Sequence, residues 1–163
     1  MPGVSSFVKT QAITWQQFHH DARLLAATLL ERGAFQGIIA VTRGGLMPAA
    51  ILARELDMHL IDTVCVSSYQ WQDQEPRVTV LKAVEGDGAG WLLVDDLVDS
   101  GRTARIVREM LPKAHFAVLY AKPQGRPLVD TYVRDVDQNT WVLFPWDSEV
   151  QYVRPLVGPR ERT

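Results

Sequence analysis

The sequence predicts one α/β domain with a central, mostly parallel sheet flanked by helices. Apolar runs at 37–41, 91–94 and 115–121 have the length and composition of buried strands. The first two runs each lead through a polar or glycine-rich loop into a segment whose apolar residues have helical spacing. Because 163 residues suffice for one hydrophobic core and rarely for two, we expect a single domain over 1–163.

The composition argues against a nucleic-acid-binding protein and against a membrane-spanning one. A formal net charge of -2 offers no basic surface to a phosphate backbone. No apolar run approaches the roughly 18 residues of a membrane span, and residues 1–9 lack the basic start and apolar core of a secretory signal. Cys65 is the only cysteine, which excludes an intrachain disulfide and fits a reducing compartment. We therefore expect a cytoplasmic protein.

The first predicted helix covers residues 15–32. Thr14 followed by Gln17 has the spacing of a capping box, and Gly33 supplies a left-handed stop. The apolar residues at helical spacing are Trp15, Phe18, Ala22, Leu25, Ala26 and Leu29. We expect this face to pack against the sheet. Residues 1–12 predict no element.

A strand, a glycine loop and a second helix follow. Residues 37–41 predict the strand, and residues 46–56 predict a helix that tolerates Pro48 in its first turn. The loop at 42–45 reads Thr-Arg-Gly-Gly, in which the glycines let the backbone approach a ligand and Arg43 adds a fixed positive charge. A second anion site and a simple tight turn both explain these residues.

The middle of the chain predicts a strand and a protruding arm. Residues 60–66 alternate enough to form a strand that is less deeply buried than its neighbours. Residues 70–77 are polar, and a strand at 78–84 and a glycine-rich turn at 85–90 follow. A lid over a site and a plain exposed hairpin both fit this pattern.

Residues 91–103 join a buried strand to a polar loop and a helix start. They read Trp-Leu-Leu-Val-Asp-Asp-Leu-Val-Asp-Ser-Gly-Arg-Thr. Unpaired amide groups and the positive end of a helix dipole make such a loop a phosphate cradle. Asp95, Asp96 and Asp99 would repel a phosphate, so they need sugar hydroxyls or a divalent cation as partners. An ordinary turn with Asp99 or Ser100 as the helix N-cap is the alternative.

The next elements lead to a lysine at a strand end. A helix is expected over residues 103–111 and a strand over 115–121, and Lys122 follows that strand directly. Open α/β sheets bind ligands at the carboxyl ends of their strands, so Lys122 is well placed, although most single lysines are surface residues. Residues 128–136 predict another strand.

The last informative segment is aromatic. Residues 139–147 read Asn-Thr-Trp-Val-Leu-Phe-Pro-Trp-Asp. The Trp141 ring offers a flat surface for a purine, and nearby backbone groups could pair with the edge of the base. Aromatic residues in such a run more often fill a core, so the residues alone favour packing. Pro155 and Pro159 predict a tail or an interface arm.

Taken together, these motifs resemble the type I phosphoribosyltransferases. Four apolar residues, two acids, two apolar residues and Asp-Ser-Gly-x-Thr within 91–103 are similar to the family's motif for phosphoribosyl diphosphate (PRPP). The resemblance extends to Arg-Gly-Gly at 43–45, Ser-Ser-Tyr at 67–69, Ala-Lys-Pro at 121–123, and Thr-Trp and Pro-Trp-Asp within 139–147. The last two features are typical of the branch that salvages 6-oxopurines.

The resemblance implies the type I phosphoribosyltransferase fold, with a small hood at about 123–150 that binds the base and a mobile lid loop at about 68–80. The glycine loop of the family often holds a non-proline cis peptide bond, which we expect after Arg43. The family also suggests a homotetramer. Some of its members attach loosely to the inner membrane face.

The activity that the resemblance implies is purine salvage with Mg²⁺ as cofactor. The 5-phosphoribosyl group of PRPP passes to guanine, xanthine or, less favoured, hypoxanthine, giving GMP, XMP or IMP and diphosphate. One alternative is a hypoxanthine-guanine enzyme that does not use xanthine. Another is a non-catalytic PRPP-sensing regulator, for which we would expect a basic face or a DNA-binding module.

The resemblance also assigns roles to residues. Asp99 is the expected catalytic residue, and Asp96 and Asp95 are the expected metal ligands. The expected PRPP-binding residues are Arg43, Gly44, Gly45, Ser68, Tyr69, Arg77, Asp95, Asp96, Asp99, Ser100, Gly101, Arg102 and Thr103. The expected purine-binding residues are Asp99, Lys122, Trp141, Val142 and Asp147. Three positions depart from the family pattern: Ser100 and Arg102 replace the commoner Thr and Gly, and Val142 replaces the usual isoleucine. The lid differs most.

Overall fold

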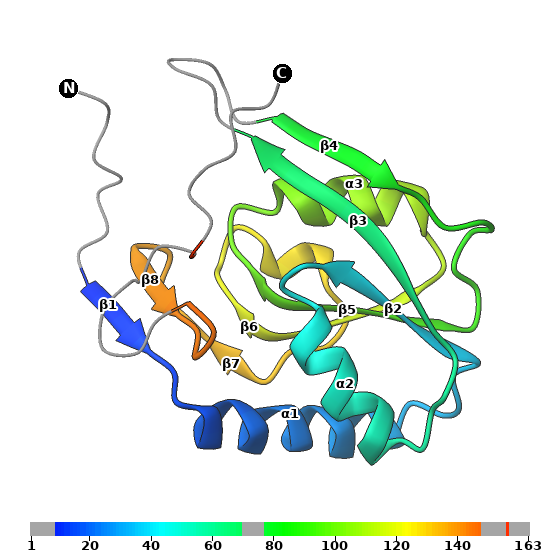
Figure 1. Ribbon diagram of the computed structural model, residues 1–163, viewed down its shortest axis with the longest axis horizontal. Helices are drawn as coiled ribbons and strands as arrows, with labels where there is room; N and C mark the ends of the chain where they lie inside the picture. The colour runs from blue at the N-terminus through cyan, green and yellow to red at the C-terminus, as the bar shows by residue number, and fades with distance from the viewer. Residues whose placement is uncertain (1–8, 70–76, 148–155, 157–163) are drawn as a thin grey trace.

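The apolar runs that predict strands form the centre of a six-stranded sheet. A computed structural model of the chain describes residues 9–69, 77–147 and 156. The strands lie in the order β4-β3-β2-β5-β6-β7 (Figure 1). Their bounds are β2 (Gly37–Thr42), β3 (Ile61–Tyr69), β4 (Arg77–Lys82), β5 (Trp91–Val98), β6 (His115–Ala121) and β7 (Arg134–Asp135). Every pair is parallel except β3 with β4, which confirms the mostly parallel sheet.

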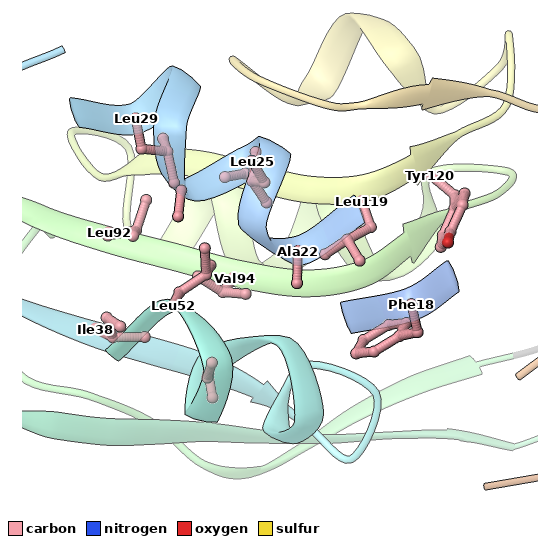
Figure 2. Packing of buried hydrophobic residues seen from close by; sticks show 14 of the residues in the cluster. Phe18, Ala22, Leu25, Leu29, Ile38, Leu52, Leu92, Val94, Leu119 and Tyr120 are labelled. Carbon is pink, nitrogen blue, oxygen red and sulfur yellow. The ribbon is translucent and has the colours of Figure 1, made fainter. Parts of the chain in front are cut away.

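Helices cover both faces of this sheet. The helices α1 (Trp15–Leu30) and α2 (Leu46–Glu55) pack on one face, and α3 (Arg102–Met110) packs on the other. Successive residues of a strand point to opposite faces, so Ile38 faces α1 and α2 whereas Ile39 belongs to the α3 side. Figure 2 shows Leu25 and Leu29 of α1 above Leu92 of β5. The domain therefore has three layers, as the sequence predicts.

The first helix begins where the sequence predicts and buries most of the expected face. The Thr14 hydroxyl accepts a hydrogen bond from the amide of Gln17 at 3.1 Å, which confirms the predicted N-cap. Phe18, Ala22, Leu25, Ala26 and Leu29 are buried. Trp15 is 55% exposed, so its prediction as a core residue is wrong. It lies in the first turn of α1, where its ring pairs with that of Trp146 alone among the described aromatic pairs.

A second, two-stranded sheet joins the two ends of the described chain. Strand β1 (Lys9–Ala12) pairs in parallel with β8 (Thr140–Leu143), with Lys9 opposite Thr140. The sequence predicts no element over 1–12, and all four residues of β1 are exposed. A strand without a buried face lacks the alternation that reveals strands in a sequence. Its pairing depends instead on a partner far along the chain.

The strand predicted over 128–136 is confirmed only at β7 and at one isolated parallel bridge between Ala117 and Thr131. The structure has a short 3₁₀ helix, η1 (Arg126–Leu128), and only the two residues of β7 in this region. Pro127 lies inside η1, and a carboxylate oxygen of Asp130 accepts a hydrogen bond from the amide of Phe116 at 2.7 Å. The Phe116 amide is therefore not available to the backbone carbonyl of a neighbouring strand, which a longer β7 would require.

The predicted arm is an antiparallel pair at the edge of the main sheet. Strand β3 continues three residues beyond its predicted end, and Ser68 and Tyr69 pair with Val78 and Arg77 of β4. Of the loop expected over 70–77 only Arg77 is described, and Pro155 and Pro159 of the expected tail and residues 148–150 of the expected hood lie outside the described residues. None of the helices in the described ranges has the length and hydrophobicity that crossing a membrane requires.

Candidate functional site

The loops with chemical signals meet at one edge of the sheet. Strands β2, β5 and β6 are parallel neighbours, so their carboxyl ends lie on the same side. The glycine loop follows β2, the acidic loop follows β5, and Lys122 follows β6. Three motifs that are far apart in the sequence are therefore brought to one place, as the topology of a parallel sheet requires.

A cavity of about 250 Å³ lies at the start of α3. Its lining residues are Ser68, Val78, Asp95, Leu97, Val98, Asp99, Ser100, Gly101, Arg102, Thr103, Ala104 and Phe116. Gly101 has a φ of 85°, a left-handed conformation that admits the helix start directly after the loop. The first amide groups of a helix have no carbonyl partner within it, and the helix dipole favours an anion there. The cavity fits the predicted phosphate cradle.

The glycine loop packs against the acidic loop. A Cβ atom at Gly44 would lie 2.6 Å from Oδ1 of Asp96, and one at Gly45 would meet the carbonyl oxygens of Val94 and Val41. Neither position has room for a side chain, which explains the two glycines. Arg43 is exposed. The cis peptide bond joins Thr42 to Arg43, so the prediction that placed it after Arg43 is wrong by one residue.

Asp95 and Asp96 form a half-buried acidic pair at the end of β5. Burial raises the pKa of the Asp95 carboxyl well above its usual range, and the neighbouring charge of Asp96 adds to the rise. Burial also raises the pKa of Asp96 to about 6, with a further contribution from the negative charge of Asp147. Oδ1 of Asp95 accepts a hydrogen bond from the amide of Asp96 at 2.9 Å, and Oδ1 of Asp96 accepts one from the amide of Leu97 at 2.7 Å.

These two acids fit a magnesium ion. Mg²⁺ prefers oxygen ligands and is commonly held by one or two carboxylates, with water and substrate phosphates completing the shell. A nearby divalent cation would stabilise the ionised form of both carboxyls, which burial and the neighbouring negative charges disfavour. Within the described ranges no group of three or more His, Cys, Asp or Glu side chains is arranged to hold a metal, so an all-protein cage is absent there.

Asp99 lies between Lys122 and Gln138. Its Oδ2 is 3.0 Å from Nζ of Lys122, and its Oδ1 accepts a hydrogen bond from Nε2 of Gln138 at 2.9 Å. Lys122 is only 1% exposed, whereas the Asp99 side chain is 47% exposed. A buried ammonium therefore contacts a carboxylate that lines the cavity at the start of α3. Asp99 and Lys122 are predicted from the sequence, whereas Gln138 is not.

The aromatic segment divides between core and surface. Thr140 and Val142 are buried, and Trp141 between them is 46% exposed, as alternation along β8 requires. Phe144 and Trp146 stack with ring centroids 4.7 Å apart in the main core. The side chain of Trp141 is therefore partly exposed, whereas Val142 can offer a ligand only its backbone groups.

The remaining predicted residues lie at different distances from the cavity. Ser68 lines the cavity, and Asp147 accepts a hydrogen bond at Oδ2 from the amide of Phe144 at 3.1 Å. Arg77 is exposed at the start of β4, opposite Tyr69. Neither Arg77 nor Arg43 is among the residues that line the cavity.

Comparison with known proteins agrees with this arrangement. A family model described as "Phosphoribosyl transferase domain" matches residues 12–153. The chain is 60% identical to a xanthine-guanine phosphoribosyltransferase from Nitratidesulfovibrio vulgaris (strain DP4), over all of both chains. It is 58% identical to one from Desulfotalea psychrophila, over 96% of this chain and 98% of that protein.

The fold agrees with a solved structure as well. A purine phosphoribosyltransferase from Pyrococcus horikoshii is similar, with a TM-score of 0.72 and 28% identity, over 92% of this chain and 99% of that one. These matches span nearly the whole domain and include every loop of the site. The chain therefore belongs to the phosphoribosyltransferase family, in the branch that contains the bacterial xanthine-guanine phosphoribosyltransferases.

Proposed function

We propose that this chain is a purine-salvage enzyme that transfers the 5-phosphoribosyl group of PRPP to guanine, xanthine and, less readily, hypoxanthine. The products are GMP, XMP or IMP, together with diphosphate. The observation that carries the proposal is the contact of Asp99 with Lys122 at the mouth of the cavity formed by residues 99–104. It joins a site suited to a phosphorylated sugar with a donor suited to a purine oxygen.

The PRPP half of the proposed site consists of the loops after β2 and β5. Residues 99–103 hold the 5′-phosphate through backbone amides at the start of α3. Asp95 and Asp96 hold the ribose hydroxyls, and the loop at 43–45 faces the diphosphate. Magnesium held by Asp96 and Asp95 would supply positive charge that stabilises the leaving diphosphate.

The base half consists of Lys122 and the segment at 141–147. The Lys122 ammonium donates to the oxygen at C6 of the purine, and the exposed ring of Trp141 stacks on the base. Val142 and Asp147 contact the edge of the base. Adenine is rejected because its 6-amino group would leave the Lys122 donor without an acceptor.

The reaction is a displacement at C1 of the ribose. A purine nitrogen forms the new bond to C1, while the bond from C1 to the diphosphate oxygen breaks and the diphosphate leaves with the electron pair. The sugar carbon passes through a state that resembles an oxocarbenium ion. The proton at N7 of the base passes to the carboxylate of Asp99. Most of the protein's contribution is positioning and charge stabilisation.

The proposal includes a lid and a hood over this site. Residues 68–80 form the lid, whose closure excludes water from the reactive sugar cation, and Ser68 at its base lines the cavity. Residues 123–150 form the hood. We further propose a homotetramer, and a cytoplasmic location supported by Cys65 as the only cysteine.

Product analysis tests the proposal. Purified protein is incubated with PRPP, Mg²⁺ and, separately, guanine, xanthine, hypoxanthine, adenine or orotate, and nucleotide formation is measured. We expect nucleotide with each of the three 6-oxopurines and essentially none with adenine or orotate. Omission of Mg²⁺ should abolish product with every base.

The alternatives give different results in the same experiment. Product from guanine and hypoxanthine but not from xanthine would replace the proposal by a hypoxanthine-guanine enzyme. Binding of PRPP without product from any base would indicate a non-catalytic regulator. Activity with adenine or orotate alone would contradict the role given to Lys122.

A further inference from the structure

We propose that Gln138 is a positioning residue that fixes the Asp99 carboxylate for proton transfer. This inference rests on the proposed function, because it concerns the residue that takes the proton from the base. Gln138 lies in the turn before β8 and is half-buried. It touches neither Asp95 nor Asp96 through any hydrogen bond that the described residues form, so its role is separate from the metal site.

The orientation of the Asp99 carboxylate needs an external support. Asp99 follows β5 in a loop, and its side chain is about half exposed. The terminal torsion of an aspartate is broad, so an unsupported carboxylate turns freely. Nε2 of Gln138 donates to Oδ1 at 2.9 Å, and Nζ of Lys122 contacts Oδ2 at 3.0 Å. Two donors on different oxygens fix the plane of the carboxylate.

The chemistry of its second contact fixes which end of the Gln138 amide faces Asp99. Oε1 of Gln138 accepts a hydrogen bond from the backbone amide of Gln124 at 3.0 Å. A backbone N–H can only donate, so the oxygen of the side chain must face Gln124. The NH₂ group then faces Asp99, whose carboxylate can only accept when ionised. Both contacts require the same orientation of the amide.

The turn that orients Gln138 is the one that follows Lys122. The amides of Gly125 and Arg126 both donate to the carbonyl oxygen of Lys122, at 3.1 and 3.0 Å. Gln124 is held within this turn. One short segment therefore carries the lysine that meets Oδ2 of Asp99 and supports the glutamine that meets Oδ1.

The two supports of Asp99 differ once a base is bound. In the proposed function Lys122 donates to the 6-oxygen of the purine, so its contact with Oδ2 competes with the substrate. The Gln138 contact with Oδ1 has no such competitor. Gln138 therefore holds the carboxylate while Lys122 turns to the base, and Oδ2 is the oxygen that accepts the proton. A neutral amide does this without adding charge beside the carboxylate.

Two substitutions separate the donor from the acceptor of Gln138. Gln138→Glu keeps an oxygen for the Gln124 amide but replaces the donor to Asp99 by a like charge, and Gln138→Leu removes both groups. Gln124→Ala is the control, because Gln124 is exposed and contributes only its backbone amide. We expect each Gln138 variant to lower kcat with guanine about ten- to a hundredfold. The KM for PRPP should change less than about twofold, and the control should match the wild type.

A second background distinguishes positioning from structural support. If Gln138 acts through Asp99, then Gln138→Leu should cost nothing further in an Asp99→Ala protein. An equal loss of kcat from Gln138→Leu in the wild-type and in the Asp99→Ala protein would overturn the proposal. A fall in the thermal unfolding midpoint that parallels the loss of kcat would overturn it as well. Wild-type kcat in both single variants would overturn it too, and would leave the proposed function intact. A wild-type protein that forms no nucleotide would overturn both the positioning role of Gln138 and the proposed function.

Discussion

In the proposed function, burial makes Lys122 a recognition group rather than an ordinary surface lysine. Its side chain is almost fully buried, yet its ammonium lies 3.0 Å from a carboxylate oxygen of Asp99. A buried charge is tolerated when it is paired, and removal of its hydration makes its hydrogen bonds stronger. A ligand that offers an acceptor at the same place can therefore gain more from Lys122 than from an exposed lysine.

Removal of this charge should relax the choice of base. Lys122→Met keeps most of the side-chain volume and should lower kcat/KM for guanine about a hundredfold, because a hydrogen bond from a charged donor is lost. The affinity for PRPP should stay within about twofold. Initial rates with guanine and with adenine give the ratio of the two kcat/KM values directly.

Lys113→Met is the matched control, since Lys113 is exposed and pairs with Asp87 away from the site. Its rates should equal those of the wild type. An unchanged ratio of guanine to adenine in Lys122→Met would remove Lys122 from base recognition.

The residues of the site were predictable from sequence to different degrees. Asp99 and Lys122 stand at strand ends beside recognisable motifs, so their positions alone suggest a function. Gln138 belongs to a residue type common at protein surfaces, and its contact with Asp99 spans 39 residues. No local pattern encodes such a pairing. Only the fold, which brings the turn before β8 next to the end of β5, reveals it.

At the scale of elements, the glycine loop after β2 determines how closely two binding loops approach. Gly44 lies against the Asp96 carboxylate, and its φ is outside the left-handed region. An alanine there would be acceptable to the backbone but not to its neighbour. Gly44 is therefore required because a side chain has no room there, and not because the backbone adopts a left-handed conformation.

Gly44→Ala should weaken PRPP binding about tenfold or more, because the added methyl group separates the loop from Asp96 at a cost of about 1–3 kcal/mol. The KM for PRPP from initial rates checks this. Gly37→Ala is the control at the other end of β2, where a Cβ atom would lie 2.5 Å from the Trp91 ring. It should lower stability and leave the KM unchanged. Equal effects of both variants on the KM would contradict the account.

The elements that the sequence predicts well are those with a buried face. The strands β2, β5 and β6 and the three α-helices carry apolar residues at regular spacing, and each appears within a few residues of its predicted bounds. Strand β1 has no buried residue. The chain over 128–133 follows β6 through irregular backbone contacts, such as the amides of Asp130 and Thr131 that both donate to the carbonyl oxygen of Phe116. Neither leaves a periodic signal.

Across the whole molecule, a buried polar cluster ties α1 to the strands β6 and β7. Asp21 of α1 is fully buried and accepts hydrogen bonds from the Tyr120 hydroxyl at 2.7 Å and from Nη2 of Arg134 at 2.9 Å. Burial and the hydrogen bond to Asp21 raise the pKa of Tyr120 far above its usual range. The cluster joins α1, β6 and β7, and Tyr120 is two residues from Lys122.

Asp21→Ala should lower the free energy of unfolding by about 2–4 kcal/mol, because it leaves a buried hydroxyl and a guanidinium without their acceptor. Urea unfolding measures the change. Asp137→Ala is the control, since it breaks the exposed pair of Asp137 with Lys9 and should cost less than about 1 kcal/mol. Similar costs for the two variants would contradict the anchoring role of Asp21.

In the proposed function, the PRPP half and the base half of the site, which different parts of the chain carry, meet at Asp99. The most direct test is to compare turnover with PRPP binding in Asp99→Ala. We predict that kcat with guanine falls at least about a hundredfold, as expected for a lost proton acceptor, while the dissociation constant for PRPP changes less than about threefold. Unchanged turnover, or a loss of PRPP binding as large as the loss of kcat, would contradict the claim.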